Sequence, residues 1–135
     1  MKEVFMATID PRTVSTAALA YFGDSVIELL VRRRLVEAGY TSSKSLNTHA
    51  RAFVSAPAQA VAMERLHEHL TEEEEAVFRR GRNLGHSAKP RGATVAEYRS
   101  ATGMEALFGY LHLTGNEERA RVLFELAYPT KNTKE

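Results

Sequence analysis

Apolar residues recur along this chain at helical spacing, and no stretch alternates apolar and polar residues for long. This pattern, broken by only four prolines and eight glycines, predicts an all-α fold. Helices are expected at residues 13–38, in a short segment after 45, and at 55–70, 71–81, 94–113 and 116–128. We therefore expect a single helical domain over residues 1–135, with its core at about 13–128.

Several helix starts are marked by capping residues. Thr71 with Glu74, and Thr94 with Glu97, have the spacing of a capping box, in which two side chains near the helix start each bond to the other residue's backbone. Asn116 is a suitable N-cap for the last helix. These residues therefore mark where the later helices begin.

Composition then narrows the class of protein. Hydrophobic residues make up 44% of the 135 residues and charged residues 26%, which excludes disordered and fibrous proteins. The chain has no cysteine, so disulfides, cysteine zinc sites and cysteine nucleophiles are excluded. No apolar run approaches the ~20 residues of a membrane span, and no signal peptide is visible. We expect a cytoplasmic protein that does not enter membranes.

Charge is unevenly distributed, although the net charge is only +1. Glu72 to Glu75 form an acidic run, which is favourable in the first turn of a helix. The alternative interpretation is the glutamate-rich metal site of a helical nucleotide pyrophosphohydrolase, and that enzyme class predicts nucleoside triphosphate substrates.

Positive charges crowd into residues 79–91, where glycines and a proline predict a surface loop. Guanidinium groups suit phosphate oxygens, so this loop indicates contact with a nucleic-acid backbone, with a solvated charge run as the alternative. The candidate contacts in it are Arg79, Arg80, Arg82, Asn83, His86, Lys89 and Arg91.

Acids interrupt two helices that otherwise look buried. In the segment 17–31, Asp24 follows Gly23, and Glu28 lies one turn later on the same face. A carboxylate among apolar side chains is costly unless it is paired or binds a metal. A glycine inside a helix indicates that another group approaches the backbone closely.

The segment 101–113 repeats this combination, with Glu105 close to Gly103. The two helices could face one another and bring their carboxylates together. Converging carboxylates without cysteine or suitably spaced histidine favour a hard cation, Mg²⁺ or Mn²⁺. Such ions bind phosphate oxygens and activate water for phosphodiester cleavage.

At these residues the sequence resembles the ribonuclease III family. AYFGDSVIELLVRRRL (20–35) is similar to the signature helix of that fold, and TGMEALFGYLHL (102–113) to its second signature helix. More narrowly, VSAPAQA (54–60), TEEEEAVFRRGRN (71–83) and AEYRSATGMEALFGYL (96–111) resemble Mini-III ribonucleases, the short bacterial branch without a double-stranded-RNA-binding domain.

The resemblance implies a homodimeric, Mg²⁺-dependent endoribonuclease of the ribonuclease III fold that cleaves double-stranded RNA. It further implies maturation of the 5′ and 3′ ends of the 23S ribosomal RNA precursor, with a ribosomal protein or the assembling large subunit as a further candidate partner. Asp24 and Glu105 match the signature acids, so they are the implied catalytic and metal-binding residues. Tyr98 and Arg99 precede the second signature helix and are candidate RNA contacts.

The sequence also departs from the wider ribonuclease III pattern, in which four carboxylates are expected. Ala20 and Thr102 occupy two of those positions, as in other Mini-III members. With two direct carboxylates, we expect one firmly held Mg²⁺ that keeps many water ligands. Glu28 is a candidate outer-shell acceptor for such waters, with a surface or ion-paired role as the alternative.

A non-catalytic RNA-binding assembly factor of the same fold is the leading functional alternative. The presence of both signature acids, Asp24 and Glu105, argues against it. Dimerisation has independent support, because the first signature helix is apolar on too many faces for a small monomer to cover easily.

Overall fold

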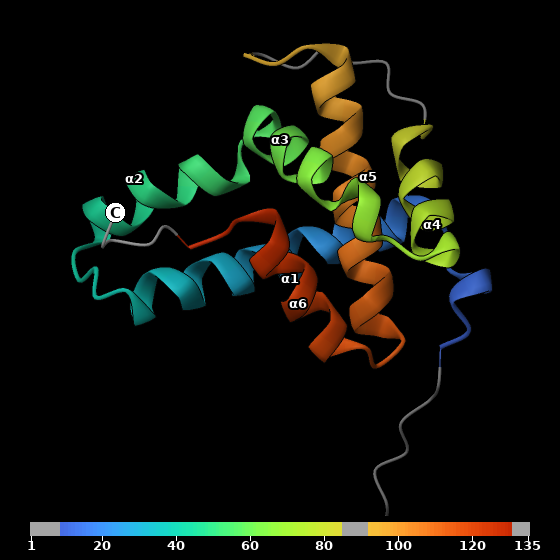
Figure 1. Ribbon diagram of the computed structural model, residues 1–135, viewed down its shortest axis with the longest axis horizontal. Coiled ribbons are helices and arrows are strands. Elements are labelled where there is room, and N and C mark those ends of the chain that lie inside the picture. Colours follow the sequence, from blue (N-terminus) through green and yellow to red (C-terminus); the bar gives the residue numbers. More distant parts are fainter. Residues whose placement is uncertain (1–8, 85–91, 131–135) are drawn as a thin grey trace, which may run out of the picture.

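The computed structural model describes residues 9–84 and 92–130, and over these ranges it contains helices and no strand (Figure 1). The all-α prediction is confirmed. The elements are η1 (Pro11–Thr13), α1 (Thr16–Glu37), α2 (Ser43–Val54), α3 (Ala56–Leu66), η2 (His67–His69), α4 (Glu72–Arg82), α5 (Val95–Leu113) and α6 (Glu117–Ala127).

The helix starts follow the capping signals in most cases. Both predicted capping boxes form, with Thr71 and Glu74 at the start of α4 and Thr94 and Glu97 at the start of α5. Asn116 stands at the N-cap position of α6, but its side chain donates a hydrogen bond to the preceding turn and does not cap the helix.

Two helix boundaries differ from the prediction. The second helix begins at Ser43, before the predicted Ser45, because the Ser42 hydroxyl accepts a hydrogen bond from the Ser45 amide and caps the first turn. The third helix ends as α-helix at Leu66 and continues as a 3₁₀ turn before Leu70.

Helix α5 is the centre of the fold, and it packs against α1, α3, α4 and α6. In Figure 1, α5 runs upright through the molecule, α1 crosses it, α4 lies on one side, and α2 and α3 lie on the other. Three of the largest fully buried side chains, Met104, Leu107 and Phe108, come from this one helix. The mostly apolar sequence of its 101–113 part is therefore explained by neighbours on most of its sides.

The crossing of α1 and α5 is a contact between backbones. A Cβ atom on Gly23 would lie 1.6 Å from the Glu105 carbonyl oxygen, and one on Gly109 would lie 2.2 Å from the Leu19 carbonyl oxygen. Since both distances are far below van der Waals contact, only glycine fits at either position. The predicted pairing of the two acid-bearing helices is confirmed.

Helix α4 packs on a different face of α5, again through glycines. A Cβ on Gly81 would lie 2.8 Å from the Gly103 Cα, and one on Gly103 would lie 2.6 Å from the Phe78 ring. The end of α4 is thereby held against the part of α5 that carries Glu105.

The acidic run at the start of α4 is tied into the fold. The Glu74 carboxylate is buried and accepts two hydrogen bonds from the Arg119 guanidinium, at 2.8 and 2.9 Å. These bonds hold the pKa of Glu74 below its usual value. Glu73 accepts a hydrogen bond from the Tyr110 hydroxyl. Two of the four acids therefore have structural partners, which agrees with the interpretation of this run as part of a helix start.

Among the described helices, none is both long and apolar enough to span a membrane.

Candidate active site

The backbone contact between α1 and α5 brings two acids together. Asp24 directly follows Gly23, and Glu105 lies one turn before Gly109, so each acid flanks the glycine of its own helix at the crossing. The Asp24 side chain is exposed, while Glu105 is partly buried and has a side-chain hydrogen bond to Asp24. Residues 81 positions apart in sequence thus become one pair.

Burial and a neighbouring negative charge make this pair unfavourable when both acids are ionised. Burial, which is the largest cause, together with the charge of Asp24 and the hydrogen bond to it, raises the pKa of Glu105 to about 8. Without a cation, the Glu105 carboxyl therefore keeps its proton at neutral pH. A divalent cation placed between the two acids would relieve the repulsion and displace the proton.

The donor set fits a hard cation. Asp24 and Glu105 offer carboxylate oxygens, and no third histidine, cysteine or acid joins them within residues 9–84 and 92–130. Mg²⁺ prefers oxygen ligands and commonly keeps several waters while one or two carboxylates hold it. Two acids at an open, partly desolvated position are sufficient for such a site.

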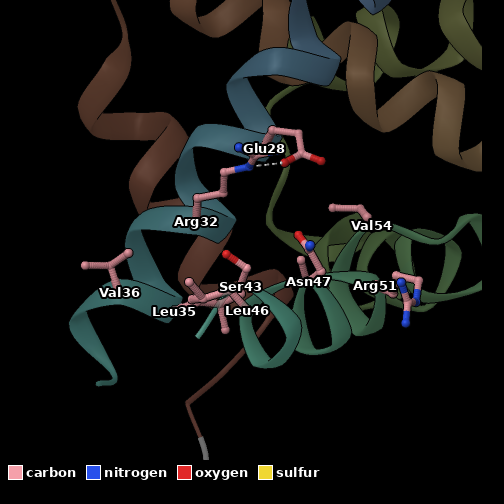
Figure 2. A pocket seen from close by; sticks show the side chains of 10 residues that line it. Glu28, Arg32, Leu35, Val36, Ser43, Leu46, Asn47, Arg51 and Val54 are labelled. Atoms are coloured by element: carbon pink, nitrogen blue, oxygen red, sulfur yellow. Dashed lines mark hydrogen bonds and ion pairs between the residues drawn. The ribbon is translucent and has the colours of Figure 1, made fainter. Parts of the chain in front are cut away.

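Glu28 lies one helical turn beyond Asp24, but it already has a partner. Its Oε1 atom accepts a hydrogen bond from Arg32 Nε at 2.8 Å, an ion pair between successive turns of α1. Glu28 and Arg32 stand at the edge of an open pocket of about 480 Å³ between α1 and α2. Figure 2 shows Glu28 and Arg32 on α1, and Asn47 and Val54 on α2 on the other side of the pocket.

The candidate RNA contacts divide into helical residues and residues outside the described chain. Arg79, Arg80 and Arg82 lie in the last turn of α4, so the helix ends one residue beyond the predicted Gly81, and the expectation that the basic loop begins at residue 79 is wrong. They remain helical because Gly81, between them, is buried against α5 and continues the packed face of the helix. All three arginines are exposed, as is Asn83 at the C-cap. The candidate contacts His86, Lys89 and Arg91 lie outside the described residues.

Tyr98 and Arg99 lie in the first turns of α5. Tyr98 is half-buried and stands seven residues, about two turns, before Glu105, which places it on the same face of the helix. Helix α4 carries three exposed arginines, and Arg99 is exposed near the start of α5. These two helices pack together at the Gly81–Gly103 contact.

Sequence reasoning missed the part played by Gly109. It assigned the small-residue gap of the second helix to Gly103, but Gly103 faces α4, and the glycine that meets α1 is Gly109. The spacing of each glycine from Glu105 could have shown which glycine faces α1. Gly109 follows Glu105 by four residues and shares its face, whereas Gly103 precedes it by two and points elsewhere.

Comparison with known proteins gives a consistent result. The Ribonuclease III domain family model matches residues 17–116. Mini-ribonuclease 3 from Symbiobacterium thermophilum is 46% identical over 123 residues, covering 90% of this chain and 94% of the relative. The Streptococcus pneumoniae Mini-ribonuclease 3 is 42% identical over 117 residues, covering 85% and 91%.

The fold agrees with these matches. A crystal structure of a protein from Fusobacterium nucleatum superimposes with a TM-score of 0.78 at 31% sequence identity, covering 85% of this chain and 92% of that one. The residues matched by the family model, 17–116, include the acid pair on α1 and α5 and the basic end of α4. The chain belongs to the Mini-ribonuclease 3 family, a branch of the ribonuclease III-domain endoribonucleases.

Proposed function

We propose that this endoribonuclease cleaves double-stranded RNA and that Asp24 and Glu105 hold the Mg²⁺ ion required for the reaction. The observation that carries the proposal is the meeting of these two acids at the α1–α5 crossing, where Glu105 is desolvated and faces the charge of Asp24. The exposed arginines of α4 support a polyanionic substrate.

The mechanism follows from these positions. When bound, Mg²⁺, or Mn²⁺ in its place, lowers the pKa of a bound water and stabilises charge on the scissile phosphate. Asp24 and Glu105 would hold the ion through their carboxylate oxygens, with Glu105 in its ionised form. Glu28 is a candidate acceptor for an outer water through its second carboxylate oxygen, because Arg32 bonds only to Oε1.

Cationic and polar side chains of α4 and α5 bind the RNA substrate. Arg79, Arg80 and Arg82 contact phosphates, and Tyr98 and Arg99 extend the same contact along α5. A-form RNA is recognised mainly by shape and by phosphate and 2′-hydroxyl contacts, so sequence preference should be limited. The family resemblance supports the ends of the 23S ribosomal RNA precursor as the substrate, within the cytoplasm and in contact with the assembling large subunit.

The two other functions receive less support. A nucleotide pyrophosphohydrolase would need the acids of the α4 start as metal ligands, but Glu73 and Glu74 are bonded to Tyr110 and Arg119. A non-catalytic RNA-binding factor would have no need for the costly approach of Asp24 and Glu105.

We propose further that two chains pair through α1. Tyr21, Leu29 and Val36 are 86%, 59% and 64% exposed, and at 100° per residue they fall on one side of this helix. Large apolar side chains exposed on one side of a helix are typical of an interface, although Ser25 and Arg32 lie between these three. An isologous dimer formed there would place one acid pair in each half, suited to cutting both strands.

Asp24→Asn should abolish cleavage and leave RNA binding intact. The amide is a poorer ligand for a hard cation, and we expect a loss in turnover of at least about 10³-fold. Duplex cleavage in Mg²⁺ and duplex binding in Ca²⁺ measure the two effects separately. A folded variant that cuts at nearly the parent rate would show that the site is elsewhere.

The raised pKa of Glu105 predicts that cation-free protein loses stability as pH rises. In the unfolded chain Glu105 ionises near pH 4.5, whereas in the folded chain it keeps its proton until about pH 8. The contribution of this proton to the free energy of unfolding is therefore complete below pH 4.5 and declines between pH 4.5 and 8. Glu105→Gln cannot ionise and should unfold at a temperature roughly 5 °C above the parent at pH 8. Thermal unfolding in EDTA from pH 5 to 8.5 measures the difference in unfolding temperature between the parent and the variant.

The controls for this pH profile are Mg²⁺ and a surface variant. Mg²⁺ should stabilise the parent at pH 8 and leave Glu105→Gln unchanged. The exposed Glu118→Gln should follow the parent throughout. If the unfolding temperatures of the parent and of Glu105→Gln change with pH in parallel, the raised pKa assigned to Glu105 is contradicted.

Removing Arg79, Arg80 and Arg82 together should weaken duplex binding and reduce its dependence on salt. Each lost phosphate contact should lower the slope of log affinity against log salt by about 0.9, the value for B-DNA. The loss should appear mostly in KM, since these charges bind the ground and transition states alike. Arg33→Ala, on the far part of α1, is the control. An unchanged salt slope would return the arginines to ordinary solvated surface.

Tyr21→Glu should convert the dimer to a monomer, because a carboxylate in a buried apolar interface is strongly unfavourable. Sedimentation at micromolar concentration should give twice 15.0 kDa for the parent and 15.0 kDa for the variant. Val122→Glu, at an exposed apolar position on α6 outside the proposed interface, should stay dimeric. A monomeric parent would exclude pairing through α1.

A further inference from the structure

Gly109 touches neither of the two acids' carboxyl groups, yet it controls how closely their helices approach. A Cβ at this position would lie 2.2 Å from the Leu19 carbonyl oxygen and 2.9 Å from the Gly23 amide nitrogen. Both atoms belong to the backbone of α1, so no side-chain rotation can make room. The helices themselves would have to separate.

The required separation is large on the scale of metal coordination. Restoring an ordinary contact of 3.4 Å needs a shift of about 1.2 Å between α1 and α5. Asp24 moves with α1, and Glu105 moves with α5. Mg²⁺ accepts oxygen ligands only near 2.0–2.1 Å, and a misplacement of about 1 Å can reduce catalysis on the order of 10²-fold.

We propose that Gly109 is a positioning residue, whose missing side chain sets the gap between the Asp24 and Glu105 carboxylates and thereby the affinity of the site for a divalent cation. The inference rests on the proposed function of that pair. Gly109 acts through the packing of α5 on α1 and makes no contact with substrate.

The chain supplies a matched control in Gly103. A Cβ there would lie 2.6 Å from the Phe78 ring and 2.7 Å from the Phe78 carbonyl oxygen, so alanine causes a comparable clash within the same helix. That clash pushes α5 away from α4 and leaves the α1–α5 crossing alone. The two alanine variants therefore separate a general loss of packing from a change in carboxylate spacing.

The experiment compares Gly109→Ala and Gly103→Ala with the parent at 10 °C, with trimethylamine N-oxide added to keep all three folded. Mn²⁺ affinity without RNA is measured by electron paramagnetic resonance, and kcat and KM are measured on duplex RNA. Both variants should melt at lower temperature. Only Gly109→Ala should lose Mn²⁺ affinity, by at least about tenfold, and kcat, by about 10²-fold, with KM nearly unchanged.

A longer acid provides a second, independent readout. Asp24→Glu adds one methylene, which should weaken Mn²⁺ binding in the parent but restore part of it in Gly109→Ala, where the gap is wider. Equal Mn²⁺ affinities for the two alanine variants, an absent rescue, or a Gly109→Ala chain that stays unfolded would each overturn the inference. A parent that binds no Mn²⁺ and cuts no duplex would instead refute the proposed function.

Discussion

The contact between the backbones of α1 and α5 is the constraint on which the rest of the structure depends. Two glycines, Gly23 and Gly109, let the helices approach until carbonyl and amide groups of one meet the Cα positions of the other. That approach draws Asp24 and Glu105 together from distant parts of the sequence. The same central helix holds α4 through Gly81 and Gly103, which brings a group of exposed arginines to the neighbouring surface.

Bringing Asp24 and Glu105 together lowers the stability of the folded chain. Burial and the charge of Asp24 raise the pKa of Glu105 to about 8, so the folded chain keeps a proton that an unfolded chain would release. A hydrophobic or amide side chain would suit that position better in structural terms. Acids placed at such cost are expected at functional sites, where a ligand compensates for the repulsion. The acids of the α4 start differ, because Arg119 and Tyr110 already satisfy them.

Much of the fold could be predicted from local signals, and the site from one local anomaly. The capping boxes of Thr71 and Thr94 and the mostly apolar segments predicted the helices nearly to their ends. The acids that interrupt those segments identified Asp24 and Glu105. Periodicity could not say which glycine faced which helix, because that depends on tertiary packing. The charge run also suggested a loop from residue 79 onward, because it hid the buried face formed by Phe78 and Gly81, whereas α4 continues to Arg82.

The most direct test of the central claim is diffraction from crystals grown with Mn²⁺, using the anomalous signal of the metal to locate it. We expect one peak between the Asp24 and Glu105 carboxylates, beside the α1–α5 crossing, with water completing the coordination. A structure whose only manganese peak lies at the Glu72–Glu75 end of α4, or one with the two acids bridged by hydrogen bonds alone at saturating Mn²⁺, would contradict it.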